Sequence, residues 1–129
     1  MTEKSTVATL NGLRLAPRKV SLVASLVRGR NVADASVILQ HTPKRAAKPL
    51  EKLIASAKAN ALHNHGMQEK DLVISTLTVT AGERLKRYRP ASRGRALPFQ
   101  RKSSNVRLVI SGITKPKKVA TTSKSKETK

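Results

Sequence analysis

Two runs of strand-forming residues, separated by a long polar connection, constrain the fold of this chain more than any other feature. Residues 72–80 (LVISTLTVT) and 106–110 (VRLVI) are rich in the β-branched side chains that favour strands. The connection, at about 80–105, is long enough to form one extended β-hairpin of about 40 Å, at roughly 3.3 Å per residue.

Strand symmetry locates the turn of this hairpin. If Val79 pairs with Val106 in an antiparallel ladder, the midpoint falls between Ser92 and Arg93. Ser92 and Gly94 are residues that tight turns accept. The pattern therefore predicts two long arms and a tip near Ser92.

The connection is strongly cationic. Residues 83–102 contain the single acid Glu83 and no alternating apolar face that could pack on a core. Ordering twenty such residues would cost about 20 to 40 kcal/mol of backbone entropy, at about 1 to 2 per residue. We therefore expect the tip to be mobile until phosphates surround it. The alternative interpretation of this segment is a solvated charged loop. The cations are Arg84, Lys86, Arg87, Arg89, Arg93, Arg95, Arg101 and Lys102.

The charge of the whole chain points to a polyanionic partner. The 129 residues include 27 Lys and Arg against 7 Asp and Glu, a formal charge of +20, and such a domain repels itself unless a polyanion neutralises it. No apolar run is long enough to span a membrane, and MTEKSTVATL lacks the features of a secretory or transit signal. We expect nucleic acid as the partner, and a protein that stays in the compartment where it is made.

Three helices are predicted before the hairpin. The first covers 17–28, with Pro17 at its start and Val20, Val23, Ala24 and Val27 on one face. The second begins after Asn31 as cap, and its apolar stripe is Ala35, Val37, Ile38 and Leu39. The third opens at Thr42-Pro43 and ends near residues 64–66, and its apolar positions at helical spacing are Ala46, Ala47, Leu50, Leu53, Ile54, Ala57 and Ala61.

Two local features qualify this prediction. Pro49 removes a hydrogen bond inside the third helix, so either the first turn is distorted or the regular helix starts later. Residues 6–15 contain a short β-prone run, which we interpret as an edge strand, and then a turn at Asn11-Gly12. The expected fold class is α+β, with three helices packed on a small three-stranded antiparallel sheet that extends into the long hairpin.

Besides the hairpin cations, the sequence contains three further groups of candidate functional residues: two aromatics, two histidines and the cations around the first helix. Tyr88 and Phe99 stand on opposite arms, where they can meet as a cross-strand pair or stack on bases. His63 and His65 point to different sides of a helix, so we expect no metal site, cofactor or catalysis there. A further cluster of cations surrounds the ends of the first helix, where an ordinary polar helix face is the alternative: Arg14, Arg18, Lys19, Arg28 and Arg30.

Three motifs carry a family resemblance: APRKVSLVASLVRGR (16–30), KLIASAKANALHNHG (52–66) and LKRYRPASRGRA (85–96). In this order and spacing they resemble bacterial large-subunit ribosomal protein number twenty-two, over about residues 8–111. The resemblance implies a structural constituent of the large ribosomal subunit and not an enzyme. It also implies a cytoplasmic ribosomal location and a hairpin that lines the nascent-polypeptide exit tunnel.

The resemblance also implies partners and contact residues. The partners are large-subunit rRNA, whose assembly the protein supports, neighbouring ribosomal proteins and the nascent chain, without a membrane or a small-molecule substrate. Matching helical positions are Lys19, Arg28, Ser56 and Asn60, and matching hairpin positions are Lys86, Arg87, Pro90, Arg93, Gly94 and Arg95. The expected tip that faces the tunnel is Arg89, Pro90, Ala91, Ser92, Arg93 and Gly94.

Residues 1–112 are expected to form one domain including the hairpin, and 113–129 a basic, flexible tail with too little apolar surface to fold. The main rival class is an architectural DNA-binding protein with a basic β-arm, which would be dimeric and would bend duplex DNA. An rRNA-modifying enzyme is a weaker rival, because the chain has neither cysteine nor a glycine-rich cofactor loop.

Overall fold

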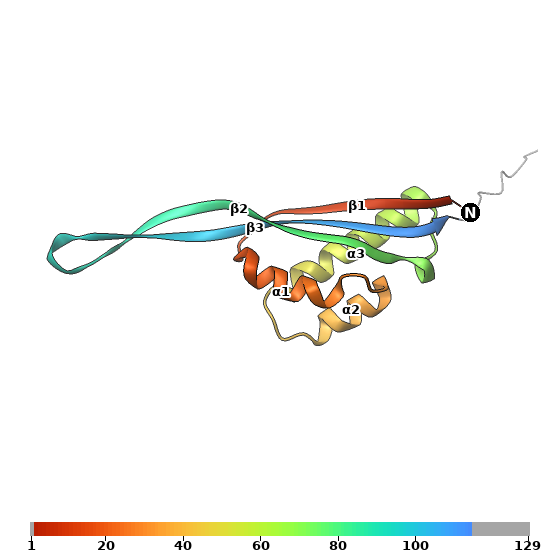
Figure 1. Cartoon of the computed structure of the whole chain (residues 1–129), viewed down its shortest axis with the longest axis horizontal. Coiled ribbons are helices and arrows are strands. Elements are labelled where there is room, and N and C mark those ends of the chain that lie inside the picture. Colours follow the sequence, from red (N-terminus) through yellow and green to blue (C-terminus); the bar gives the residue numbers. More distant parts are fainter. Residues whose placement is uncertain (1, 115–129) are drawn as a thin grey trace, which may run out of the picture.

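The computed structural model describes residues 2–114 and shows an α+β fold, as predicted. Three helices cover one face of a three-stranded antiparallel sheet with the order β1-β3-β2, and two of the strands continue beyond the helices as a long arm (Figure 1). The strands are β1 (Thr2–Leu13), β2 (Val73–Pro90) and β3 (Ala96–Thr114). The helices are α1 (Pro17–Val27), α2 (Val32–His41) and α3 (Ala47–His65), with short 3-10 turns η1 (Glu69–Asp71) and η2 (Ser92–Gly94).

The pairing predicted for the hairpin is confirmed. Val79 lies opposite Val106 in the antiparallel ladder of β2 and β3. β1 is an edge strand, also as predicted, and pairs antiparallel with β3 on its other side. β3 ends at Thr114, two residues beyond the expected end of the domain, and residues 115–129 of the expected tail lie outside the described residues.

The predicted turn at Asn11-Gly12 is wrong. Both residues remain within β1, where the register shifts between Leu10 and Leu13 and Gly12 has a φ of +70°. Two residues of β1 thus stand opposite one residue of β3, which is a β-bulge. The glycine serves the same backbone requirement as in a turn, but the strand continues through it.

The core lies between the helices and alternate residues of the sheet. Val106, Leu108 and Ile110 on β3 are buried toward the helices, because alternate side chains of a strand point to one face. α1 contributes its predicted face, Val20, Val23, Ala24 and Val27, all of which are buried. No helix within residues 2–114 is long and apolar enough to cross a membrane.

The apolar stripe predicted for α2 needs correction. Val37 is 55% exposed, whereas Val32, which the pattern missed, is buried. The start of α2 is held by the backbone, since the N–H of Val32 donates to the carbonyl of Leu72 at 3.0 Å. This contact turns Val32 inward and leaves Val37, rotated by about 140°, facing outward. Asn31 occupies the N-cap position, but its side chain makes no capping hydrogen bond.

α3 begins at Ala47 and not at Pro43, so the predicted start is wrong and the later start is correct. Pro49 then lies in the first turn, where a backbone N–H has no partner within the helix and its loss costs little. The predicted apolar positions are all buried, and the helix ends at His65, followed by Gly66 as a left-handed C-cap with a φ of +59°.

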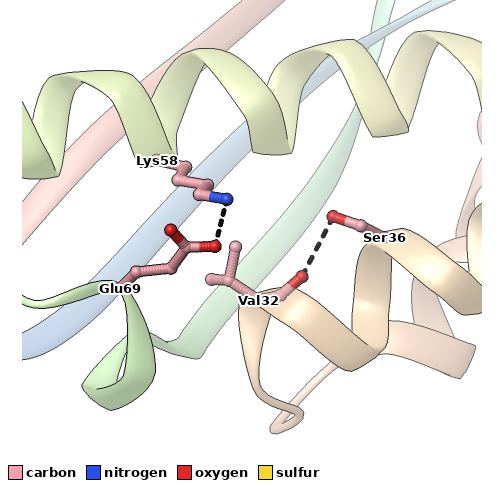
Figure 2. A network of polar contacts seen from close by, with 4 residues as sticks. All are labelled: Val32, Ser36, Lys58 and Glu69. Carbon is pink, nitrogen blue, oxygen red and sulfur yellow. Dashed lines mark hydrogen bonds and ion pairs between the residues drawn. The ribbon is translucent and has the colours of Figure 1, made fainter.

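One ion pair joins α3 to the segment before β2, and one side-chain hydrogen bond closes within α2. Lys58 on α3 forms an ion pair with Glu69 of η1, and the hydroxyl of Ser36 donates to the carbonyl of Val32 at 3.0 Å within α2 (Figure 2). Among the side chains that the structure describes, Lys58 and Glu69 form the one ion pair.

The burial of α3 leads to a stability prediction. Replacing Leu50, which is 1% exposed, by alanine leaves a cavity in the core and should lower the free energy of unfolding by about 2 to 5 kcal/mol. The matched change Leu22→Ala removes the same atoms from a side chain that is 72% exposed and should alter the free energy of unfolding by about 0.5 kcal/mol or less. Urea unfolding followed by circular dichroism measures both, and equal effects would contradict the assignment of the core.

Candidate nucleic-acid interface

The arm leaves the domain at a neck formed by two bulges on either side of β3. Asn11 and Gly12 of β1 lie opposite Asn105, and Gly82 and Glu83 of β2 lie opposite Ser103. β1 ends just beyond this point, so only β2 and β3 continue (Figure 1). The neck is therefore where a three-stranded sheet becomes a two-stranded ribbon.

Side chains of β3 hold both bulges in place. The side-chain oxygen of Asn105 accepts a hydrogen bond from the N–H of Gly12 at 2.9 Å, and the hydroxyl of Ser103 donates to the carbonyl of Glu83 at 2.5 Å. A Cβ atom on Gly82 would lie 2.7 Å from the Ser103 hydroxyl, too close for ordinary contact. Gly82 thus permits the close approach of the two strands.

Beyond the neck, the arm has no residue buried in the domain. Every residue from 83 to 102 is exposed except Ala91 and Phe99, which are partly exposed. The structure places all eight predicted cations on this ribbon, with Glu83 at its base as the one carboxylate: Arg84, Lys86, Arg87, Arg89, Arg93, Arg95, Arg101 and Lys102. The arm is thus a cationic ribbon whose only internal stabilisation is the β-ladder and local side-chain contacts.

The register divides the ribbon into two faces, because directly opposed residues share a face and neighbours alternate. The Phe99 face combines apolar side chains with arginines, and its members are Leu85, Arg87, Arg89, Leu97, Phe99 and Arg101. The Tyr88 face holds Arg84, Lys86, Tyr88, Pro90, Ala96, Pro98, Gln100 and Lys102. Neither face packs on the core, as expected, but the apolar residues Leu85, Leu97 and Phe99 all lie on the Phe99 face.

The bulge at Gly82 and Glu83 corrects the expectation for the aromatics. Tyr88 pairs with Pro98 and Phe99 pairs with Arg87, so the two rings lie on opposite faces and do not form a cross-strand pair. Phe99 instead contacts the guanidinium of Arg89, whose central carbon lies 4.8 Å from the ring centroid. This cation–π contact presents an arginine fork held against a ring on the exposed ribbon.

The tip closes in a tight turn. Ser92–Gly94 form η2, with left-handed backbone at Arg93 (φ 59°) and Gly94 (φ 69°). The N–H of Ala91 donates to the carbonyl of Arg95 at 2.8 Å and joins the two arms at the turn. The turn lies at the predicted position, although the extra residue in the β2 bulge moves the midpoint from between Ser92 and Arg93 onto Arg93 itself.

The cations predicted around α1 form two groups and not one. Arg14, Arg18 and Lys19 lie at the start of the helix, and Arg28 and Arg30 follow its end, about 16 Å away at 1.5 Å per residue. Arg14 lines a hollow of about 560 Å³ at the neck, together with Glu83 and Leu85.

At the other end of α1, both arginines also serve the fold. The Nε of Arg28 donates to the carbonyl of Leu77 at 2.9 Å, and the Nε of Arg30 donates to the carbonyl of Leu26 at 2.8 Å. These bonds orient the two guanidinium groups beside the end of the helix.

A third cationic site lies along α3. Ser56 lines a groove between β1 and α3 together with Lys48 and Lys52, two lysines that were not among the predicted contact residues. Lys48, Lys52, Ser56 and Asn60 follow one another at intervals of four residues, so they share one helix face. That spacing was a signal from which the two lysines could have been found.

The histidines take no part in a cluster. His63 and His65 lie in the last turn of α3, as expected. Within residues 2–114 no group of three or more His, Asp or Glu side chains is placed to hold a metal ion.

Comparison with known proteins agrees with these features. A family model described as ribosomal protein L22p/L17e matches residues 8–111. The large ribosomal subunit protein uL22 of Herpetosiphon aurantiacus is 48% identical over 103 residues, which are 80% of this chain and 91% of that protein. The matched residues include the three helices, the neck and the whole arm.

The absence of buried residues in the arm predicts how it behaves alone. In the free protein at low salt, amides between residues 85 and 101 should exchange with deuterium far faster than those of Val106–Ile110, because opening the ribbon exposes no apolar core. Exchange followed by mass spectrometry or NMR measures both sets. Strong protection of residues 89–95 in the free chain would contradict this prediction.

Proposed function

This chain belongs to the ribosomal protein L22p/L17e family, and we propose that it binds large-subunit rRNA through its arm and helix ends while the arm lines the nascent-polypeptide tunnel. As a member of the family it is a structural constituent of the large ribosomal subunit and not an enzyme. Its place in the ribosome is then cytoplasmic in a bacterial cell. The proposed partners are rRNA, neighbouring ribosomal proteins and the nascent chain, with no membrane and no small-molecule substrate.

The observation that carries the rRNA proposal is the exposed cationic ribbon. Eight arginines and lysines and one carboxylate occupy a segment in which no residue is buried. Arginine forks bind phosphate bidentately and stack on unpaired bases, and both contacts suit irregular RNA. Binding would supply the free energy that burial does not, so the arm and its RNA would become ordered together, which supports a role in subunit assembly.

The helical layer supports a second area of contact with rRNA. Arg14, just before α1, lines the hollow at the neck, and Lys48, Lys52 and Ser56 of α3 line a groove along β1. Contacts at these sites would fix the domain against RNA while the arm extends away from it. We therefore assign Arg14, Arg18, Lys19, Arg28, Arg30, Ser56 and Asn60 as proposed rRNA contacts of the domain.

The shape of the arm supports the tunnel proposal. A two-stranded ribbon closed by a three-residue turn is narrow enough to pass between RNA segments, and its tip carries small residues, Ala91, Ser92 and Gly94, beside Arg93. Two dissimilar faces allow one side to hold RNA while the other borders an open passage. The rival DNA-architectural function is disfavoured by the family match.

Neutralising the arm tests the rRNA proposal. In a variant with Arg84, Lys86, Arg87 and Arg89 replaced by glutamine, the slope of log K against log salt for purified large-subunit rRNA should become shallower by about 3, at roughly 0.7 to 0.9 per lost phosphate contact. Filter binding over a salt series measures the slope. A control with Arg87→Lys and Arg89→Lys keeps the charge and should keep the slope while it weakens binding. An unchanged slope in the glutamine variant would place the contacts elsewhere.

A crosslinker at the tip tests the tunnel proposal. A photoreactive amino acid at Ser92, in ribosomes stalled on a radiolabelled nascent chain, should crosslink that chain. The same group at Thr78, which is exposed on the sheet face that no helix covers, should not. Reaction of the Ser92 probe with rRNA alone would count against a tip that borders the tunnel.

A further inference from the structure

An apolar groove lies on the helical layer, away from the arm. It is bounded by α1 on one side and by the loop between α2 and α3 on the other, and it has a volume of about 430 Å³. In Figure 1 this loop runs from the end of α2 past α1 to the start of α3. The residues that line the groove include Leu22, Leu26, Lys19, Thr42, Lys44 and Arg45.

The groove presents leucines that the fold leaves uncovered. Leu22 is 72% exposed and Leu26 45% exposed, and they are one helical turn apart on α1. Leu22 is more exposed than any other large apolar side chain on the described helices. Val23, on the next face of α1, is buried and forms the floor. The fold itself gives no reason for two adjacent leucines at a solvent boundary.

The rim of the groove is cationic. Lys19, Lys44 and Arg45 border it, and no carboxylate lines it. An occupant must therefore fill an apolar floor and also neutralise positive charge at the edges. The chemistry that meets both demands is a protein segment with an apolar side chain between carboxylates.

Other occupants fit the groove less well. rRNA would satisfy the lysines but would leave the leucines against a charged, hydrated backbone. A second copy of this chain brings a formal charge of +20 toward a cationic rim, and residues 115–129 are themselves rich in lysine. Like charges oppose both of these occupants.

We propose that this groove is the docking site for an acidic, apolar segment of a neighbouring protein in the large subunit. The proposal rests on the family membership of the chain and not on the path of the arm. It assigns the exposed leucines of α1 to protein contact and the arm to RNA, and Lys19, a proposed rRNA contact, lies on the rim where the two surfaces meet.

Photocrosslinking within purified large subunits tests the docking site. A photoreactive amino acid replaces Leu22 or, as a matched control, Val37, which is 55% exposed on α2 and does not line the groove. The expected result is a crosslink from position 22 to one protein peptide that contains Asp or Glu beside an apolar residue, and no such crosslink from position 37. Reaction of position 22 with rRNA, or with no macromolecule, would overturn the proposal.

A charge reversal tests the acidic character of the occupant. Arg45→Glu, combined with the probe at position 22, should abolish the protein crosslink, whereas Lys70→Glu, an exposed change in η1 outside the groove, should preserve it. An unchanged crosslink yield with Arg45→Glu would overturn the acidic part of the proposal. Subunits are isolated by gradient before irradiation, so each yield refers to incorporated, folded protein. The salt slope of the arm variants is a separate measurement, so failure here leaves the rRNA proposal untouched.

Discussion

The central strand β3 is the element on which the rest of the molecule depends. It pairs with β1 on one side and β2 on the other, and each register shift in these ladders places the extra residue on an outer strand. Because β3 keeps its alternation, Ser104, Val106, Leu108 and Ile110 all face the helices. The same alternation continues past the neck, so the Tyr88 face of the arm extends the helix-covered face of the sheet. The Phe99 face extends the uncovered one.

The two parts that β3 joins, the domain and the arm, differ in charge and in burial. The domain can close by burial, since its core residues are apolar and nearly free of buried polar groups; only Thr6 and Ser104 have buried hydroxyls without a partner in the described part. The arm cannot close in this way, because its side chains are cationic and exposed. One continuous strand therefore joins a region stabilised by the hydrophobic effect to a cationic region that buries no apolar core.

Much of this division follows from the sequence. The β-branched runs predict the pairing of Val79 with Val106, and the helical spacing of Leu50, Leu53 and Ile54 predicts the buried face of α3, because burial and periodicity are local properties. The bulges do not follow. The composition of a strand does not reveal a single extra residue, yet that residue moves every later side chain of the strand to the other face. This is why Tyr88 and Phe99 lie on opposite faces of the arm. The sequence also predicts the start of α2 after Asn31, but it misses the burial of Val32, which accompanies a backbone contact with Leu72 that no local pattern encodes.

Under the proposed function, the role of the neck is to fix the direction in which the arm leaves the domain. If the direction of the arm were free at its base, RNA binding would have to restrict that direction as well as order the arm. This would add to the conformational entropy that binding costs. The two bulges supply that base: Asn105 holds Gly12, Ser103 holds the carbonyl of Glu83, and Gly82 lets the strands meet. The arm thus starts from a defined direction and becomes ordered along one path. Its base is specified by hydrogen bonds within the chain, and its length is left to be ordered by phosphates.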